Sequence, residues 1–275
     1  MQFLPLKSKF LNSIIRLSSL AKIAMLSLIF MVAAISAEAS HFRYGSISWQ
    51  KINNSTDQVQ FKVKQGWRSS AFGNPTVGQS VNVGNLQFGD GSSGSMSLVV
   101  TAVNAAEDWF FGEAIVNHTY ATNGVYTASF SSCCRIGGLS FTPGSSWNLN
   151  TVVTTGTTNS SPVQTVPPII NVQTGQTAAT FSVPAVDPDG DVITYGLASN
   201  PGLMSINSST GVISWNTVGR AINSLWVCQA TASDGNTTVT SDFIIRIVQT
   251  STPPVFDYTV TPVNGQVCEV FPVQP

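Results

Sequence analysis

Residues 61–67 read FKVKQGW, a short run in which apolar and polar side chains alternate before a glycine interrupts it. Alternation with a period of two places one set of side chains on each face of an extended strand. Similar runs recur as VYTASF (125–130), ATFSV (179–183), VITYGL (192–197), GVISW (211–215) and SDFIIRIV (241–248). Glycine, asparagine, serine and proline separate them at the spacing typical of β-sandwiches, so the sequence predicts an all-β fold.

The composition excludes several classes of function. Only 9% of the 275 residues are charged, whereas 43% are hydrophobic, so hydroxyl and amide side chains must cover much of the surface. The formal net charge is −1 and no basic cluster lies beyond the N-terminal segment. A nucleic-acid partner is therefore not expected.

The N-terminus has the features of a secretory signal peptide. Basic residues precede an uncharged run from Ile23 to Ile35, and Ala37 and Ala39 supply small side chains for cleavage. We assign residues 1–39 to this signal and expect a secreted product without a transmembrane anchor after cleavage. Retention of the segment as an uncleaved anchor is the alternative.

Proline pairs divide the rest of the chain. We expect a β-sandwich at 40–150, a polar linker at 151–168 that ends in two prolines, and a second β-sandwich at 169–249. The pattern G-Q-x4-F-x-V occurs at Gly175 and again at Gly265, which indicates the start of a further, incomplete repeat at 250–275. The expected architecture is a tandem of Ig-like sandwiches joined by Pro-rich linkers.

Four cysteines would be able to form disulfides in an oxidising compartment. Adjacent Cys133 and Cys134 on one strand would point to opposite faces, so we expect each to have a separate fate. Pairing with Cys228 and Cys268 stays open among three arrangements. The spacings match no zinc motif.

Three motifs in the first half carry a family resemblance. Phe88-Gly89-Asp90-Gly91 is followed by Asn117-His118-Thr119-Tyr120 and then by Gly124-Val125-Tyr126-Thr127. In order and spacing they resemble the polycystic kidney disease (PKD) repeat, an Ig-like sandwich, over about residues 80–135.

Individual side chains of these motifs have structural interpretations. The Asp90 carboxylate, between two glycines, suits a turn in which it accepts backbone N–H bonds. We expect Tyr120 and Tyr126 to bury their rings and bond their hydroxyls to the backbone. His118 is expected to be packed or hydrogen-bonded, without an acidic partner in the motif.

The second half resembles the dystroglycan-type cadherin-like, Ig-like domain of secreted and surface proteins. The motifs that carry this resemblance are Pro167-Pro168, Asp187-Pro188-Asp189-Gly190-Asp191, Asn207-Ser208-Ser209-Thr210-Gly211 and Ala232-Ser233-Asp234-Gly235.

The acidic loop predicts a calcium site. Asp187, Asp189 and Asp191 alternate in one loop, the fold is expected to bring Asp234 close, and Ca²⁺ takes six to eight oxygen ligands. The loop is no EF-hand, because its glycine comes at the fourth position. Asp-Pro-Asp-Gly is also good turn chemistry by itself. A third carboxylate is superfluous in a plain turn, so we favour Ca²⁺ that stiffens the joint between modules.

Two further patterns have structural and functional interpretations. The run Glu107-Asp108-Trp109-Phe110-Phe111 places rings on both faces of a strand, where one exposed ring would stack on a sugar or both would be covered. Six asparagines begin N-x-S/T triplets, a number close to chance in a Ser/Thr-rich chain that matters in a glycosylating host: Asn53, Asn54, Asn117, Asn159, Asn207 and Asn236.

These features predict a secreted, non-enzymatic surface or matrix protein whose modules act in adhesion or as a stalk, with an extracellular protein or glycan as partner. The alternative is a carbohydrate-binding accessory region of a larger secreted hydrolase. The chain contains neither GxSxG nor HExxH, and no catalytic residues are assigned.

Overall fold

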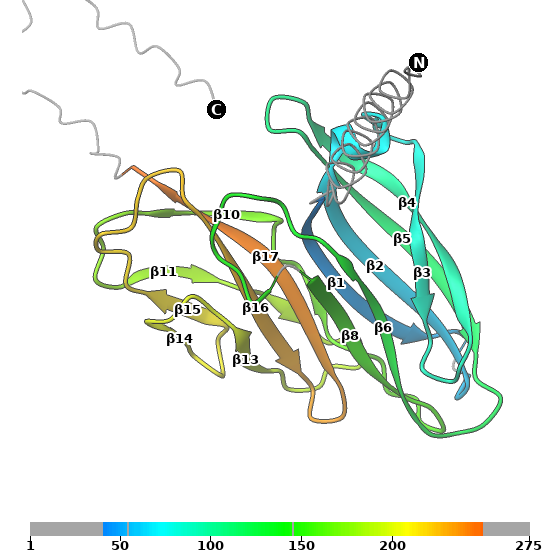
Figure 1. Cartoon of the computed structure of the whole chain (residues 1–275). Coiled ribbons are helices and arrows are strands. Elements are labelled where there is room, and N and C mark those ends of the chain that lie inside the picture. Colours follow the sequence, from blue (N-terminus) through cyan, green and yellow to red (C-terminus); the bar gives the residue numbers. More distant parts are fainter. Residues whose placement is uncertain (1–40, 54, 145, 250–275) are drawn as a thin grey trace, which may run out of the picture.

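The computed structural model describes residues 41–53, 55–144 and 146–249 (Figure 1). The all-β prediction is confirmed, because regular structure in these residues consists of strands and one short 3-10 helix, η1 (Ser69–Phe72). No helix among the described ranges is long and apolar enough to cross a bilayer. The predicted signal peptide (1–39), the predicted further repeat (250–275) and Cys268 lie outside the described residues.

The strands form two lobes that lie side by side (Figure 1). The first lobe packs a hairpin layer, β6 and β8, against a sheet with the order β1-β2-β5-β4-β3. Its strands are β1 (Phe42–Lys51), β2 (Gln58–Arg68), β3 (Ser80–Gln87), β4 (Ser93–Asn104), β5 (Trp109–Thr119), β6 (Val125–Cys133) and β8 (Ser146–Thr154).

The second lobe packs the small sheet β11-β15-β14 near β10, β17, β16 and β13. Strand β7 comes from the first half of the chain but pairs with β16. The strands are β7 (Leu139–Phe141), β9 (Val163–Gln164), β10 (Ile169–Gln173), β11 (Ala179–Ser182), β12 (Ala185–Val186), β13 (Thr194–Ser199), β14 (Met204–Ile206), β15 (Val212–Trp215), β16 (Leu225–Ser233) and β17 (Thr238–Val248).

Strand β17 connects the two lobes by backbone hydrogen bonding. Its first half pairs with β1 at Gly45↔Asp242 and with β8 at Val239↔Thr151, while its second half pairs in parallel with β10. The strand order β1-β2-β5-β4-β3-β6-β8-β17 therefore returns to β1. The two halves of the chain share one hydrogen-bonded sheet.

This shared strand explains why SDFIIRIV is an almost continuous apolar run. Phe243, Ile245 and Ile247 belong to the core of the second lobe, while Ile244 on the opposite face is also buried. When both faces of a strand are buried, apolar side chains occur at successive positions and do not alternate with polar ones.

The segment predicted as a linker, residues 151–168, contains structure of its own. Strand β8 continues to Thr154, and β9 pairs with β12. The backbone N–H of Ser161 donates to the Trp49 carbonyl at 2.9 Å, while the Ser161 hydroxyl accepts from the Trp49 N–H at 2.8 Å. This connection is anchored to the first lobe over part of its length.

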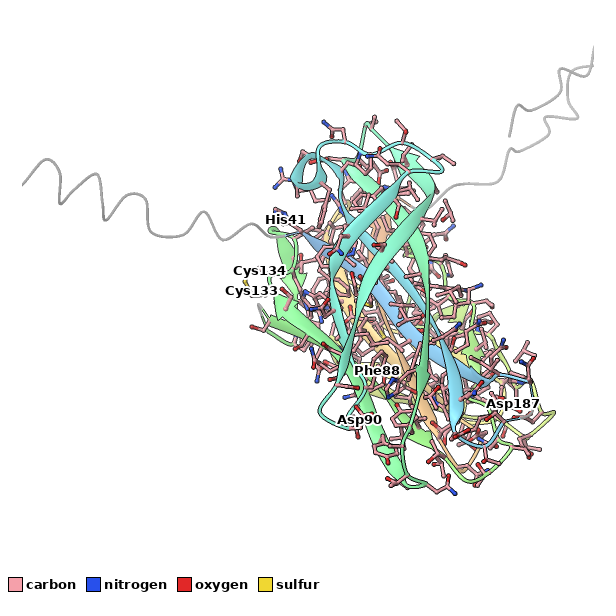
Figure 2. All side chains as sticks on the ribbon, turned by 90° about the vertical axis from the view of Figure 1, so that its right-hand side faces the viewer. His41, Phe88, Asp90, Cys133, Cys134 and Asp187 are labelled. Carbon is pink, nitrogen blue, oxygen red and sulfur yellow. A yellow bond between two sulfur atoms is a disulfide. The ribbon has the colours of Figure 1, made fainter. Side chains whose placement is uncertain are left out.

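The cysteine prediction was wrong for the adjacent pair. Cys133 and Cys134 are bonded to each other, with their Cα atoms 3.2 Å apart, across a cis peptide bond (Figure 2). The argument from strand alternation fails because β6 ends at Cys133, so Cys134 is no longer part of a strand. Cys228 is a buried free thiol, and burial strongly raises its pKa.

Two glycines of the FGDG turn provide a matched test of its geometry. Both are left-handed, with φ of +88° at Gly89 and +90° at Gly91. A Cβ on Gly89 would lie 2.5 Å from the backbone oxygen of Thr127, whereas one on Gly91 meets nothing within 4 Å. We expect Gly91→Ala to lower the free energy of unfolding by about 1–2 kcal/mol, the strain of a left-handed residue. Gly89→Ala should lower it further, which urea titration would measure; equal losses would contradict this turn geometry.

Candidate functional site

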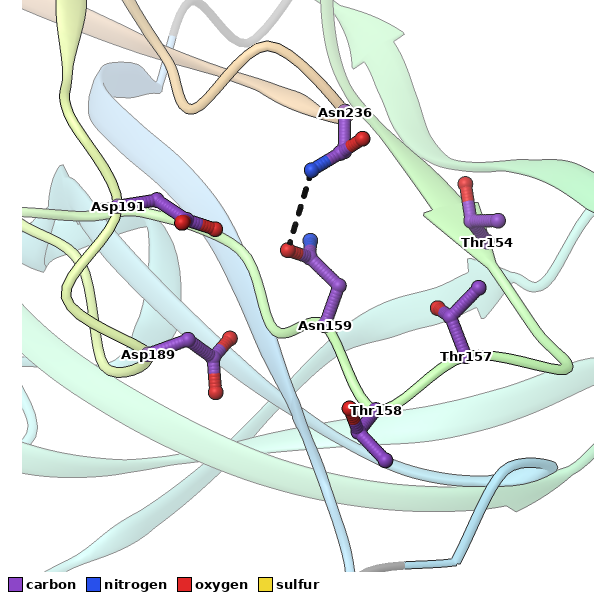
Figure 3. Close-up of a pocket in the computed structure, with 7 residues that line it drawn as sticks. All are labelled: Thr154, Thr157, Thr158, Asn159, Asp189, Asp191 and Asn236. Carbon is purple, nitrogen blue, oxygen red and sulfur yellow. Dashed lines mark hydrogen bonds between the residues drawn. The ribbon is translucent and has the colours of Figure 1, made fainter.

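A polar pocket of about 320 Å³ lies where the two lobes meet (Figure 3). Three parts of the chain form it: the end of β8 with the segment that follows it, the acidic loop after β12, and the turn between β16 and β17. Its side chains carry carboxylate, amide and hydroxyl groups, from Thr154, Thr157, Thr158, Asn159, Asp189, Asp191 and Asn236.

Asp187 shapes the acidic loop from within. One carboxylate oxygen accepts the backbone N–H groups of Asp189 at 2.9 Å and Asp191 at 3.1 Å, as in an Asx turn. The other oxygen, Oδ2, is buried and has no hydrogen-bond partner among the described residues, in a residue only 9% exposed. Figure 2 shows Asp187 at the end of the molecule away from the disulfide. An unpaired buried carboxylate oxygen is costly unless a cation or water satisfies it.

The other three predicted ligands differ in how they are engaged. Asp189 accepts the backbone N–H of Ser160 at 2.6 Å, which ties the acidic loop to the segment after β8. Asp191 lines the pocket beside it. One oxygen of Asp234 closes the β16–β17 turn by accepting the N–H of Asn236 at 2.7 Å. The structure therefore places Asp189 and Asp191 at the pocket, and gives Asp187 and Asp234 turn-forming contacts.

Sequence reasoning did not assign Asn159 and Asn236 to this site. The Asn159 amide nitrogen donates to Asp234 Oδ2 at 3.0 Å. The Asn159 Oδ1 accepts from the Asn236 amide nitrogen at 3.4 Å (Figure 3). These contacts link the segment after β8 to the β16–β17 turn. Both residues begin N-x-S/T triplets, but nothing in that pattern distinguishes a pocket residue from an exposed one.

The chemistry of the pocket suits a hard cation. Carboxylate, amide and hydroxyl oxygens are the ligands that Ca²⁺ takes, and the unpaired Asp187 oxygen adds demand for positive charge in the loop. Within the described residues, however, no three Asp, Glu, His or Cys side chains lie close enough to form a metal cluster. A cation here would use Asp189 and Asp191 together with neutral oxygens such as those of Asn159 and Asn236.

The prediction that His118 is packed or hydrogen-bonded is confirmed, and its partner is an acidic residue of a different motif. Its Nε2 lies 2.7 Å from Oδ2 of Asp90, which belongs to the FGDG turn. The imidazole stacks on Phe88 with centroids 4.0 Å apart. As expected, Asp90 accepts the Ser92 N–H, and the buried Tyr120 hydroxyl donates to a backbone carbonyl, that of Phe88. These contacts brace one end of the first lobe.

The aromatic run offers little surface for stacking on a sugar. Phe110 is fully buried in the first core, and Phe111 packs near Tyr44, whose ring belongs to the second core. Trp109 is half-buried, and its indole N–H donates to Glu107. Both strand faces are covered at Phe110 and Phe111 because β5 lies between the two cores.

Two acidic residues of the turn between β4 and β5, Glu107 and Asp108, form ion pairs. Arg246 of β17 bonds Glu107 through two guanidinium nitrogens, which adds a charged contact between the lobes. Asp108 accepts from the Ser70 hydroxyl and backbone and from Arg68, and these bonds lower the pKa of Asp108 to about 2.

The low pKa of Asp108 predicts a dependence of stability on pH. The folded pKa lies below the ordinary value of 3.8, so this group stabilises the fold above pH 4, and the contribution disappears as pH falls through about 2. Asp108→Asn should keep the backbone, because asparagine tolerates the φ of 53° at this position. We expect its stability to fall less steeply between pH 4 and pH 2, as measured by thermal unfolding. Parallel pH curves for the two proteins would refute this assignment.

Part of the chain matches a known family model. Residues 43–156 match the family model described as Integrin beta-like protein A-E, N-terminal. The match begins in β1 and ends just after β8, so it covers the first lobe together with β7.

Similarity to complete proteins extends further. Integrin beta-like protein A of Dictyostelium discoideum is 31% identical over 301 residues, which cover 89% of this chain and 16% of that protein. Integrin beta-like protein C of the same organism is 36% identical over 154 residues, or 50% of this chain and 8% of that protein. The chain thus spans a small part of the length of these relatives.

Among solved structures, the ectodomain of human Desmocollin-1 has a TM-score of 0.28 and 11% identity, over 72% of this chain and 48% of that one. The chain is therefore similar to integrin beta-like proteins, through the N-terminal region that their family model describes.

Proposed function

We propose that this chain is an extracellular, non-enzymatic adhesion region of the integrin beta-like type. The observation that carries the proposal is the similarity to integrin beta-like protein A, which covers 89% of the chain and hence both lobes. The fold supports it, because a β-sandwich pair with a shared strand presents stable surfaces. The partner would be an extracellular protein or glycan.

We further propose that the pocket between the lobes binds Ca²⁺ through Asp189 and Asp191. When bound, the ion would neutralise the two carboxylates and attract the amide and hydroxyl oxygens opposite them. Since β17 already joins the lobes by strand pairing, the ion's role would be to fix three surface segments at the joint. It would not be needed to set the orientation of the lobes.

Calcium should raise stability modestly. Extracellular sites bind with Kd near 0.1–1 mM, so we expect 1 mM Ca²⁺ to raise the free energy of unfolding by about 1 kcal/mol. The Asp189→Asn/Asp191→Asn variant should lose this gain, and chelator should abolish it in the wild-type protein. Differential scanning calorimetry with Ca²⁺, Mg²⁺ and chelator would measure the effect.

A matched control distinguishes the loss of the pocket carboxylates from the loss of a carboxylate elsewhere on the protein. Asp90→Asn removes a carboxylate that pairs with His118 and lies outside the pocket. This variant should keep the full response to Ca²⁺. The metal proposal fails if the wild-type protein shows no Ca²⁺ response, or if Asp90→Asn and the pocket variant lose it equally.

The adhesion proposal is tested with the whole chain recovered from the medium of expressing cells. Surfaces coated with the protein should retain suspended cells above the level of a denatured control. Glycan-array binding without cell retention would favour the accessory-region alternative. A protein that binds no glycan and retains no cells would contradict a binding role. Loss of retention in the pocket variant alone would connect adhesion to the calcium pocket.

A further inference from the structure

The N-x-S/T triplets of this chain differ sharply in their folded surroundings. Side-chain hydrogen bonds are defined for four of the six asparagines, and these four fall into two pairs. Asn117 and Asn207 are exposed, and their amide nitrogens have no hydrogen-bond partner among the described residues. Asn159 and the exposed Asn236 line the pocket and are hydrogen-bonded to each other. Asn53 shares its overlapping triplet with Asn54, which lies outside the described residues.

Asn117 projects from the outer face of β5. Its Oδ1 accepts a hydrogen bond from Gln60 Nε2 at 3.2 Å, and Gln60 in turn accepts one from Gln50 at 3.2 Å. This ladder of amides across three strands fixes the carboxamide plane. The Asn117 amide nitrogen makes no hydrogen bond to any described residue, and Asn117 is exposed.

Asn207 has the same arrangement in a turn of the second lobe. Its Oδ1 accepts the backbone N–H groups of Ser209 at 2.9 Å and Thr210 at 3.1 Å. The nitrogen again lacks a described partner, and the residue is exposed. A substituent on nitrogen leaves the oxygen's bonds intact, so a modified Asn207 keeps its turn.

Asn159 is engaged through the nitrogen itself. That atom donates to Asp234 at 3.0 Å and to the Ser160 carbonyl at 2.8 Å, and the side chain is half-buried in the pocket wall. Asn236 lines the same pocket. A sugar on either nitrogen would occupy the space between the lobes.

The third residue of the triplet also distinguishes Asn159 from Asn117 and Asn207. Thr119 and Ser209 are exposed, and neither side chain makes a hydrogen bond to the described residues. By contrast, Ser161 is fully buried, and its hydroxyl bonds the backbone of Trp49. The triplet that begins at Asn159 is therefore folded into the joint.

We propose that Asn117 and Asn207 carry N-linked glycans and that Asn159 and Asn236 do not. The proposal rests on the extracellular location given under Proposed function, since export exposes the chain to glycosylation. The amide nitrogen attacks C1 of the first sugar of a polyprenyl-pyrophosphate-linked oligosaccharide and loses a proton. The C1–O bond breaks, and the lipid pyrophosphate leaves with the electron pair. Transfer can precede folding, so the folded structure selects which modified chains reach the native state.

A glycan at Asn117 would also cover exposed apolar surface. Ile115 lies two residues away on the same face of β5 and is 56% exposed, and Val99 on the adjacent strand is 49% exposed. In a protein with so few charged residues, hydration of this flat face by a glycan would oppose association.

The test maps glycans on the full chain secreted by a eukaryotic cell. Enzymatic deglycosylation in heavy-oxygen water followed by peptide mass spectrometry should label Asn117 and Asn207 and leave Asn159 and Asn236 unlabelled. Secreted protein with Asn117 and Asn207 bare, or with Asn159 occupied, would overturn the assignment while leaving the adhesion proposal standing. A chain retained in the cytosol would overturn both.

Variants of the hydroxyl residues keep the asparagines unchanged. Thr119→Val should remove one glycan and increase the mobility of the secreted protein by one step, whereas Thr119→Ser should retain the glycan. Ser209→Ala and Ser209→Thr provide the corresponding pair for the second lobe. Equal mobility within either pair would refute glycosylation at that asparagine.

Discussion

Replacing Arg135 by methionine is expected to lower the free energy of unfolding by about 3–5 kcal/mol, the usual effect of breaking a buried ion pair. The Arg135 guanidinium bonds Asp242 through two nitrogens, at 2.7 Å and 2.5 Å, and the two side chains are 3% and 0% exposed. Arg135 follows the disulfide of the first lobe, whereas Asp242 lies on β17. The variant would leave the Asp242 carboxylate buried with only the amide of Gln229 as a side-chain hydrogen-bond donor among the described residues.

A second substitution distinguishes the unpaired charge from lost packing. In Arg135→Met/Asp242→Asn the amide is neutral and its oxygen still accepts from Gln229, so at least half of the lost stability should return. Urea unfolding followed by tryptophan fluorescence would measure all three proteins. If the double variant were as unstable as Arg135→Met alone, the loss would come from packing against Phe42, over whose ring Arg135 lies.

Trp49→Ala is expected to lower the free energy of unfolding by a similar amount, about 3–5 kcal/mol. Trp49 is 1% exposed in the core of the first lobe, and its indole N–H donates to the Val152 carbonyl at 2.8 Å. The substitution removes a large buried ring and leaves that carbonyl without its indole donor. Alanine keeps the backbone bonds between residue 49 and Ser161, but the lost ring leaves that backbone without its packing in the core, so the effect should extend to the connection between the lobes.

Trp109→Ala serves as the matched control, because Trp109 is only half-buried and its ring bonds Glu107 at the surface. The decrease in the free energy of unfolding caused by Trp109→Ala should be less than half of that caused by Trp49→Ala. Hydrogen exchange would add a local measure, with amides near Ser161 exchanging faster in Trp49→Ala only. Equal losses in the two variants would contradict the central position of Trp49.

Because β17 is shared between the lobes, an ion in the acidic pocket is not needed to fix the orientation of the lobes. Independent sandwiches on a flexible linker would need an ion to set their orientation. Here β17 already pairs with β1 and β8, and the ion pairs of Asp242 and Arg246 reinforce the contact. The role proposed for Ca²⁺ at Asp189 and Asp191 is therefore to organise the surface segments at the joint.

Part of the candidate site could be predicted from sequence. Asp187, Asp189 and Asp191 belong to one loop, so their proximity follows from the chain itself. Asn159 and Asn236 could not be found this way, because 77 residues separate them and strands β9 to β16 lie between them in the chain. The His118–Asp90 pair was missed for the same reason, since the strands and not the sequence spacing bring the two side chains to 2.7 Å.

The sequence alone determined the strands, through alternating side chains and glycine-rich turns, because these depend on contacts between near neighbours and on which face meets water. It also determined the FGDG turn, where only local geometry is needed. The tertiary structure alone decided that Cys133 bonds Cys134, that β17 joins both lobes, and which acidic side chains face the pocket. These outcomes depend on contacts between segments that are distant in the sequence. The pattern of side chains along one segment does not specify which distant segment it will contact.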